Sequence, residues 1–145
     1  SKKEASEIYM KSIKYTDFLL GNDEEFGILA MDYDKGLEIA KSLSKSINIV
    51  IYKKGENGSL TFANEQEINK GIFKVKALKP TGAGDAFIGA LIGSIVNNYS
   101  LDKSIEIGSA AAAIVVTKVG CSAAMPDLNE IKKFMNINKI VYNGK

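Results

Sequence analysis

Hydrophobic residues recur along this chain with two kinds of spacing that alternate. Short runs of apolar or β-branched residues predict strands, and stretches with apolar residues three and four positions apart predict helices. The predicted extended segments are residues 17–20, 47–52, 59–63 and 71–78, and the predicted helices are 23–31, 34–43, 86–95, 104–118 and 128–135. Because helices and strands follow each other along most of the chain, the pattern indicates an α/β layered fold.

The length and composition fit one globular domain with a substantial core. The chain has 145 residues, of which 46% are hydrophobic and 25% charged. We expect this domain to span residues 1–137 and the polar tail 138–145 to fray. The longest apolar stretch, Gly108 to Val116, is about half of the roughly 20 residues that a membrane span needs. We therefore expect a soluble, cytoplasmic protein that does not bind membranes.

Charge and residue types exclude several classes of function. The formal net charge is only +2 and the basic residues are spread along the chain, so we expect no nucleic-acid partner. The chain has no histidine, which excludes a histidine metal site and a Ser-His-Asp triad. The single cysteine, Cys121, cannot form an internal disulfide, and we expect it to serve only in packing.

A turn rich in glycine comes directly before the helix predicted at 86–95. In Thr81-Gly82-Ala83-Gly84-Asp85, two glycines let backbone N–H groups converge without obstruction by a Cβ atom. A helix N-terminus adds partial positive charge at the same point, which favours a bound phosphate. The chain has neither a G-x-x-x-x-G-K-[ST] P-loop nor G-x-G-x-x-G spacing, so a P-loop NTPase and a Rossmann dehydrogenase are disfavoured.

Asp85, at the end of this turn, has two interpretations. A carboxylate repels phosphate, but it can accept the proton of a hydroxyl group that attacks a γ-phosphate, which would make Asp85 a general base. Alternatively, Asp85 is the N-cap of the helix and the glycines only form a tight turn. The residues of the motif alone leave both interpretations open.

Other segments are ambiguous in the same way. Asn22 and Glu25 offer oxygen atoms that suit Mg²⁺, yet their spacing is also that of a helix capping box. Gly55 and Gly58 by themselves predict only a hairpin turn. The small residues of 108–113, and Gly89 with Gly93, favour close packing against another element.

In this order and spacing, the segments resemble the ribokinase-like, or phosphofructokinase-B, family of carbohydrate kinases. The run Thr81 to Phe87, followed by Gly89-Ala90, is similar to the C-terminal signature of the family. Asn22-Asp23-Glu24-Glu25 is similar to its Asn-x-x-Glu motif. Lys54 to Gly58 resembles its Gly-x-x-Gly turn beside the nucleotide, and Ala110 to Cys121 resembles the stretch that lines the adenine pocket.

The resemblance implies a fold, an activity and a set of site residues. The fold would be the C-terminal portion of a ribokinase-like three-layer α-β-α sandwich, with a mainly parallel sheet flanked by helices. The activity would be transfer of the γ-phosphate of ATP to a hydroxyl of a sugar or sugar acid, with Mg²⁺ as cofactor and a homodimer as one assembly. The implied site has Asp85 as catalytic base, Asn22 and Glu25 as magnesium ligands through water, and ATP-binding residues Thr81, Gly82, Ala83, Gly84, Lys54, Gly55, Gly58, Ala112 and Val116.

The resemblance covers nearly the whole chain but only about the second half of a typical family member. The other half would supply the sugar pocket and a lid, so we expect this chain alone to be inactive or very slow. Gly108 to Val116, Ala124-Met125-Pro126 and Lys53-Lys54-Gly55 are most similar to the branch of the family that acts on 5-dehydro-2-deoxygluconate. The alternative is a non-catalytic nucleotide-binding or structural fragment that associates with another chain.

Two positions depart from the family pattern. Lys79 stands where relatives that bind a monovalent cation carry Asp, and Ala124 stands where they often carry Ser. Both changes remove oxygen ligands, so dependence on a monovalent cation is in doubt. The Lys79 ammonium group either takes the place of that cation or is an ordinary surface lysine.

Overall fold

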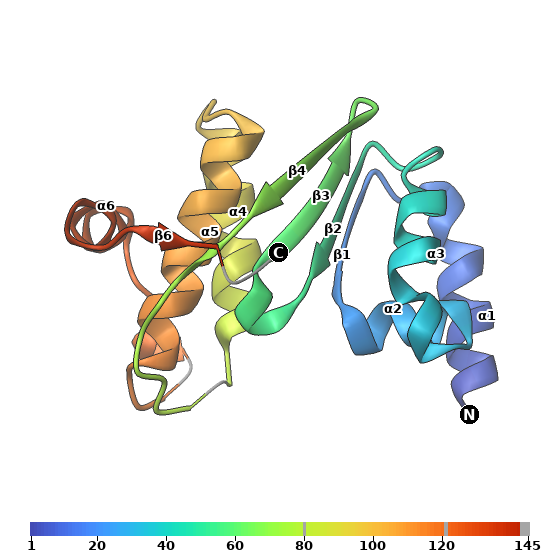
Figure 1. The fold of residues 1–145 in the computed structure, drawn as a ribbon, viewed down its shortest axis with the longest axis horizontal. Coiled ribbons are helices and arrows are strands. Elements are labelled where there is room, and N and C mark those ends of the chain that lie inside the picture. The colour runs from blue at the N-terminus through green and yellow to red at the C-terminus, as the bar shows by residue number, and fades with distance from the viewer. Residues whose placement is uncertain (80, 121, 143–145) are drawn as a thin grey trace. The chain divides into compact units, whose positions relative to one another are not determined.

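The computed structural model describes residues 1–79, 81–120 and 122–142, and the chain divides into two compact units (Figure 1). One unit is Ser1–Asn69 and the other is Lys70–Lys145. The sequence predicted one domain over residues 1–137, whereas the structure has a division after Asn69. Each unit contains its own buried apolar cluster. In the part of the chain that is described, no helix is both long enough and apolar enough to cross a bilayer.

The first unit joins α-helices to a mixed sheet. Its main elements are α1 (Lys2–Ser12), β1 (Phe18–Asn22), α2 (Asp23–Ala30), α3 (Gly36–Leu43), β2 (Ile49–Lys53), β3 (Ser59–Ala63) and β4 (Gln66–Lys70). The strand order is β1-β2-β3-β4. Strands β1 and β2 are parallel, with Phe18 opposite Ile49, and β2 and β3 are antiparallel, with Lys53 opposite Ser59. The predicted α/β class is therefore present, with a parallel pair that continues into an antiparallel hairpin.

The apolar cluster of this unit lies between α2, α3 and the sheet. Ala40 of α3 and Val50 of β2 are each 0% exposed. The rings of Phe26 and Tyr52 contact each other with their centroids 5.4 Å apart. A parallel pair of strands needs a crossover connection, and α2 and α3 supply it between β1 and β2. The crossover fixes where β1 ends, and the predicted magnesium-ordering motif begins there.

The second unit is built mainly from helices. Its elements are β5 (Ile72–Phe73), α4 (Ala83–Val96), α5 (Leu101–Val116), α6 (Leu128–Ile137) and β6 (Ile140–Val141). Helix α5 supplies most of the buried cluster, and its Ala110 and Val115 are both 0% exposed. The cluster also includes Phe73 of β5 and Ile131 of α6. A central apolar α5 thus supports α4, the helix that carries the predicted phosphate-binding turn.

The chain after α6 departs from the prediction of a frayed tail. Ile140 and Val141 form β6 and pair in antiparallel register with Phe73 and Ile72 of β5. Ile140 also packs against the buried cluster of the unit. Residues 143–145 of the predicted tail lie outside the described residues. The run predicted to be extended over 71–78 is a strand only at Ile72–Phe73, because β6 pairs with those two residues.

Close packing of helices involves a different glycine from the pair that the sequence indicated. A Cβ atom placed on Gly108 of α5 would lie 2.9 Å from the carbonyl oxygen of Phe87 and 3.3 Å from Cβ of Leu91, both on α4. A Cβ atom on Gly89 or Gly93 would meet no heavy atom within 4 Å. Gly108 therefore permits the close contact between α4 and α5, whereas Gly89 and Gly93 face open space.

This difference predicts opposite effects of the same substitution. Gly108→Ala should lower the free energy of unfolding, because overpacking against backbone costs about 1–3 kcal/mol, and the gain in helix propensity of about 0.5–1 kcal/mol offsets only part of that cost. Gly89→Ala keeps the gain without the clash and should be neutral or stabilising. Urea unfolding followed by circular dichroism measures both variants. A Gly108→Ala variant as stable as wild type would contradict the packing described above.

Candidate active site

The N-terminus of α4 offers free backbone donors. Gly82 is its N-cap, with a φ of 88° that glycine adopts without strain, and no side chain caps the helix. The N–H of Ala86 donates to the carbonyl of Gly82 at 3.0 Å. The N–H groups of Ala83, Gly84 and Asp85 precede this bond and have no acceptor within the helix. The turn is therefore suited to an anion, as the sequence predicted.

Asp85 occupies the third position of α4 and its side chain is exposed. The alternative that it caps the helix is wrong, because Gly82 holds the N-cap position. Among the described residues its carboxylate has no hydrogen-bond or ion-pair partner. This exposed carboxylate lies in the first turn of an uncapped helix, so it is available to a ligand placed at the free N–H groups.

Two hydrogen bonds hold the segment that leads into this turn. The N–H groups of Leu78 and Lys79 both donate to the carbonyl oxygen of Val116, at 2.7 and 3.2 Å. Val116 ends α5, so these bonds use a carbonyl group that has no partner inside its own helix. The end of α5 thereby fixes the approach to the phosphate-binding turn.

The small residues of α5 divide between packing and partial exposure. Ala110, Ala111 and Ala113 are buried in the cluster of the unit, which confirms close packing for these positions. Ala112 and Val116 lie one turn apart and are only half-buried. A half-buried apolar pair is a suitable surface for a flat purine ring, so the assignment of both residues to ATP binding stays a prediction.

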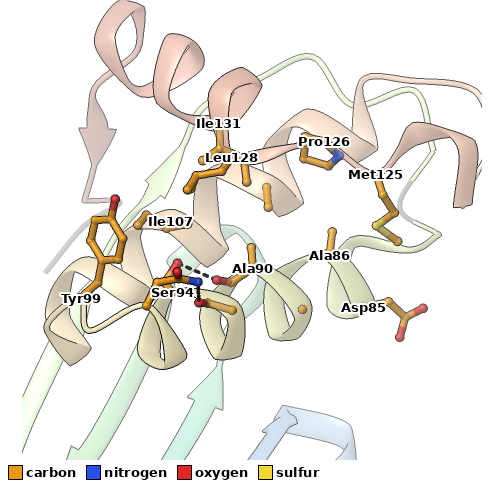
Figure 2. Close-up of a pocket in the computed structure, with 14 residues that line it drawn as sticks. Asp85, Ala86, Ala90, Ser94, Tyr99, Ile107, Met125, Pro126, Leu128 and Ile131 are labelled. Carbon is orange, nitrogen blue, oxygen red and sulfur yellow. Dashed lines mark hydrogen bonds between the residues drawn. The ribbon is translucent and has the colours of Figure 1, made fainter.

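A cavity of about 370 Å³ lies beside α4, with Asp85 and Ala86 at one end (Figure 2). Its polar groups are largely satisfied, since the Ser94 hydroxyl donates to the Ala90 carbonyl and the Asn97 side chain donates to the Gly93 carbonyl, both at 2.7 Å. The lining is otherwise mostly apolar. Sequence reasoning missed this cavity because its walls come from residues far apart in the chain, which are Asp85, Ala86, Gly89, Ala90, Gly93, Ser94, Asn97, Tyr99, Ile107, Ala111, Met125, Pro126, Leu128 and Ile131.

In the first unit, Asn22 and Glu25 form the capping box that their spacing allowed. The Asn22 side chain accepts from the Glu25 N–H at 2.7 Å, and Glu25 Oε2 accepts from the Asn22 N–H at 2.6 Å. A Cβ atom on Gly21 would lie only 3.3 Å from Glu25 Oε2, so a glycine there leaves room for the carboxylate. Glu25 remains exposed. The capping role is confirmed, and a role with magnesium stays a prediction.

The carboxylates around this motif do not form a metal site by themselves. The described residues contain no group of three or more Asp, Glu, Cys or His side chains able to hold a metal ion. Magnesium here would therefore need oxygen atoms from water and from the nucleotide, as it commonly does in phosphate sites.

Tyr52 of β2 has the altered acidity of a buried phenol. Burial raises the pKa of the Tyr52 phenol, and the negative charge of Asp23 raises it further.

The turn between β2 and β3 has the expected glycine conformations. Gly55 and Gly58 have positive φ angles of 55° and 81°. The Lys54 N–H donates to the Gly58 carbonyl at 2.7 Å and closes the turn. The hairpin turn is confirmed, and the space around Gly55 is open to an approaching ligand.

The remaining predicted residues are placed as follows. Thr81 and Lys79 are exposed, and Ala124 is 2% exposed. Cys121, which we expected to serve in packing, lies outside the described residues. The predicted site residues come from both units: Asn22, Glu25, Lys54, Gly55 and Gly58 from the first, and Thr81, Gly82, Ala83, Gly84, Asp85, Ala112 and Val116 from the second.

The chain has an α/β fold, and the uncapped end of α4 leaves backbone donors that are suited to an anion. Comparison with known proteins identifies its family. Residues 1–128 match the pfkB family carbohydrate kinase profile. The chain belongs to the pfkB family of carbohydrate kinases, which confirms the resemblance read from its motifs.

Individual similar proteins agree with this assignment. The chain is 32% identical over 141 residues to a 5-dehydro-2-deoxygluconokinase of Bacillus anthracis. The aligned stretch covers 93% of this chain and 42% of that protein. It is similar to the crystal structure of ribokinase from Thermotoga maritima, with a TM-score of 0.80, 29% identity and coverage of 86% of this chain and 43% of that one. A nucleoside kinase from Methanocaldococcus jannaschii gives a TM-score of 0.80 at 26% identity, with coverage of 91% and 44%. The ribokinase-like fold is confirmed, and the chain spans less than half the length of these relatives.

Proposed function

We propose that this chain is the nucleotide-binding, catalytic portion of an ATP-dependent carbohydrate kinase. One observation carries the proposal: the same end of α4 presents free N–H donors and an exposed carboxylate. The donors suit the γ-phosphate, whose oxygen atoms carry charge during transfer. The carboxylate suits the hydroxyl group that attacks it. Membership of the pfkB family supports both assignments.

The chemistry assigned to Asp85 is that of a general base. Asp85 accepts the proton of the acceptor hydroxyl while the hydroxyl oxygen forms a bond to the γ-phosphorus. The bond between that phosphorus and the bridging oxygen of ADP breaks, and ADP leaves with the electron pair. The N–H groups of Ala83, Gly84 and Asp85 stabilise the charge on the transferred group without any movement of their own. Gly82 keeps the approach open because it has no side chain.

The other predicted residues have supporting roles in this proposal. Lys54, Gly55, Gly58 and Thr81 contact ATP, and Ala112 with Val116 forms the apolar surface for its base. Asn22 and Glu25 would hold Mg²⁺ through water molecules, and Mg²⁺ would neutralise phosphate charge when bound. A ribokinase-like relative from E. coli, a putative ribokinase II, has been crystallised in complex with ATP and Mg²⁺. The proposal includes no monovalent cation, and we place the kinase in the cytoplasm.

For the acceptor we propose a sugar or sugar acid, specifically 5-dehydro-2-deoxygluconate. The support is the 32% identity to relatives of that name, which extends over 93% of this chain. Because the chain spans only 42% of that relative, residues that recognise the acceptor are expected outside the stretch described here.

Binding of ATP with Mg²⁺ to this chain tests the proposal directly. We expect ATP-Mg²⁺ to raise the melting temperature, because a ligand that binds only the folded state stabilises it. Gly82→Ala should reduce this shift, since a Cβ atom in the left-handed conformation costs roughly 1–2 kcal/mol and crowds the free N–H groups. Gly89→Ala makes the same change inside α4, where a Cβ atom would meet no heavy atom within 4 Å, so it is the control and should keep the full shift. No shift for the wild-type protein would overturn the proposal.

Glu25→Gln separates the capping role from the magnesium role. A glutamine side chain still accepts from the Asn22 N–H, so stability should change by no more than about 0.5 kcal/mol. The lost charge should weaken the Mg²⁺-dependent part of the ATP shift. Thermal shift titrations with Mg²⁺ at fixed ATP measure this part. If Glu25→Gln and wild type respond equally to Mg²⁺, Glu25 acts only as a cap.

A further inference from the structure

We infer that the ion pair between Lys118 and Glu130 positions the end of α5 for nucleotide binding. Lys118 lies two residues beyond the end of α5, and Glu130 lies in the first turn of α6. The Lys118 Nζ donates to Glu130 Oε1 at 2.5 Å, within the second unit. The match to the family ends at residue 128, so Glu130 lies beyond it. The inference rests on the proposed function and adds two positioning residues to it.

Both partners of the pair stand on backbone that is already held. The Lys118 N–H donates to the Val115 carbonyl at 3.1 Å. The Glu130 N–H donates to Oδ1 of Asp127, the N-cap of α6, at 2.8 Å. Because the backbone is fixed on each side, formation of the pair costs mainly side-chain entropy. The pair can therefore transmit a constraint from α6 to the end of α5.

The end of α5 is where such a constraint matters for the nucleotide. Val116 contributes to the half-buried surface proposed for the purine, and its carbonyl accepts from Leu78 and Lys79 ahead of the proposed phosphate turn. The next residue, Thr117, is held by its hydroxyl, which donates to the Ile114 carbonyl at 2.7 Å. Displacement of this helix end would disturb the purine surface. A surface that is held before the ligand arrives loses less entropy on binding.

Helix α6 is a firm support for the pair. Ile131, directly after Glu130, is 3% exposed and belongs to the same buried cluster as Ala110 of α5. The two charged side chains are half-buried, with 37% of Lys118 and 44% of Glu130 exposed. Solvent screens such a pair in part, so its effect on binding is moderate. The Lys118 ammonium group is paired with a carboxylate, which favours a positioning role over direct contact with phosphate.

Charge reversal tests the inference through the dissociation constant for ATP-Mg²⁺, measured by calorimetry on the 145-residue chain. Lys118→Glu and Glu130→Lys each replace attraction by repulsion, so each should raise the dissociation constant about two- to tenfold. The double variant restores an ion pair with the charges exchanged and should bind more tightly than either single variant. Lys103→Met with Glu106→Gln removes another ion pair, 3.1 Å long and near the opposite end of α5. This control should bind like wild type.

Each result supports the inference or overturns it. Single variants that bind like wild type, or a double variant no better than the single ones, would overturn it. Weaker binding by Lys118→Glu combined with tighter binding by Glu130→Lys would also overturn it, because Lys118 would then contact the phosphates directly. Urea unfolding shows whether each variant folds. If one does not, Lys118→Met and Glu130→Gln replace the reversals and should weaken binding to a smaller extent.

The wild-type protein separates this inference from the proposed function. If it does not bind ATP-Mg²⁺, the proposed function is wrong and the inference that rests on it is wrong too. If it binds and the charge reversals have no effect, only the inference fails.

Discussion

Replacement of Asp85 by Asn in an intact kinase that contains this chain should lower kcat by roughly 10²–10⁴-fold. Asparagine has nearly the same shape but cannot accept the proton of the attacking hydroxyl. The side chain of Asp85 is exposed and has no partner among the described residues, so the fold should not change. The affinity for ATP should be retained or improve slightly, because a negative charge near the phosphates is removed.

The measurement is steady-state turnover together with the affinity for ATP-Mg²⁺. Asp34→Asn makes the same chemical change at an exposed carboxylate of the first unit and is the control. We expect its kcat to equal that of wild type. Retained kcat in Asp85→Asn would contradict its role as base. A parallel loss of ATP affinity and kcat would instead indicate that Asp85 acts in binding.

The 145-residue chain by itself should form ADP in a sugar-dependent manner at a rate lower than that of an intact kinase by on the order of 10⁵-fold. Its acceptor would have to arrive from solution, without the alignment that a binding pocket supplies, and such alignment is worth effective molarities of about 10⁵ M or more. The coverage of only 42% of the Bacillus anthracis relative is the reason to expect that the pocket is outside this chain.

A coupled assay for ADP at saturating ATP and sugar acid measures this rate. The same preparation should still give a thermal shift with ATP-Mg²⁺, which separates loss of turnover from loss of folding. Addition of the acceptor-binding portion of the relative should restore turnover in part. Turnover by the isolated chain at ordinary kinase rates would show that it holds its own acceptor site.

Much of the fold could be predicted where apolar spacing was regular. The strand at Ser59–Ala63 has the bounds that the sequence indicated, and α2 begins directly after Asn22, whose spacing to Glu25 is that of a capping box. Helix α1 was missed because its spacing is weakly apolar, although the capping pair Ser1 and Glu4 was a usable signal. Strand β4 was missed because Gln66–Lys70 is largely polar and is held by its neighbour β3 in the sheet.

Local structure at the candidate site could be predicted where it depends on neighbouring residues. The motif from Thr81 to Asp85 predicted the open helix end and the carboxylate beside it, and both are present. Their role in binding and catalysis stays a prediction. Prediction failed for Gly89 and Gly93, whose spacing favours close packing, although a Cβ atom at either position would meet no heavy atom within 4 Å. It also failed for the cavity, because nothing in the residues around Pro126 indicates that they lie opposite α4.

The carbonyl of Val116 joins two parts of the proposed nucleotide site. It accepts hydrogen bonds from the N–H groups of Leu78 and Lys79, so the end of α5, which carries the surface proposed for the purine, is tied to the segment before the turn proposed for the terminal phosphate. Both parts belong to the second unit. If the proposed site is right, this unit alone would hold the two ends of the nucleotide, and movement of the first unit would not change their separation.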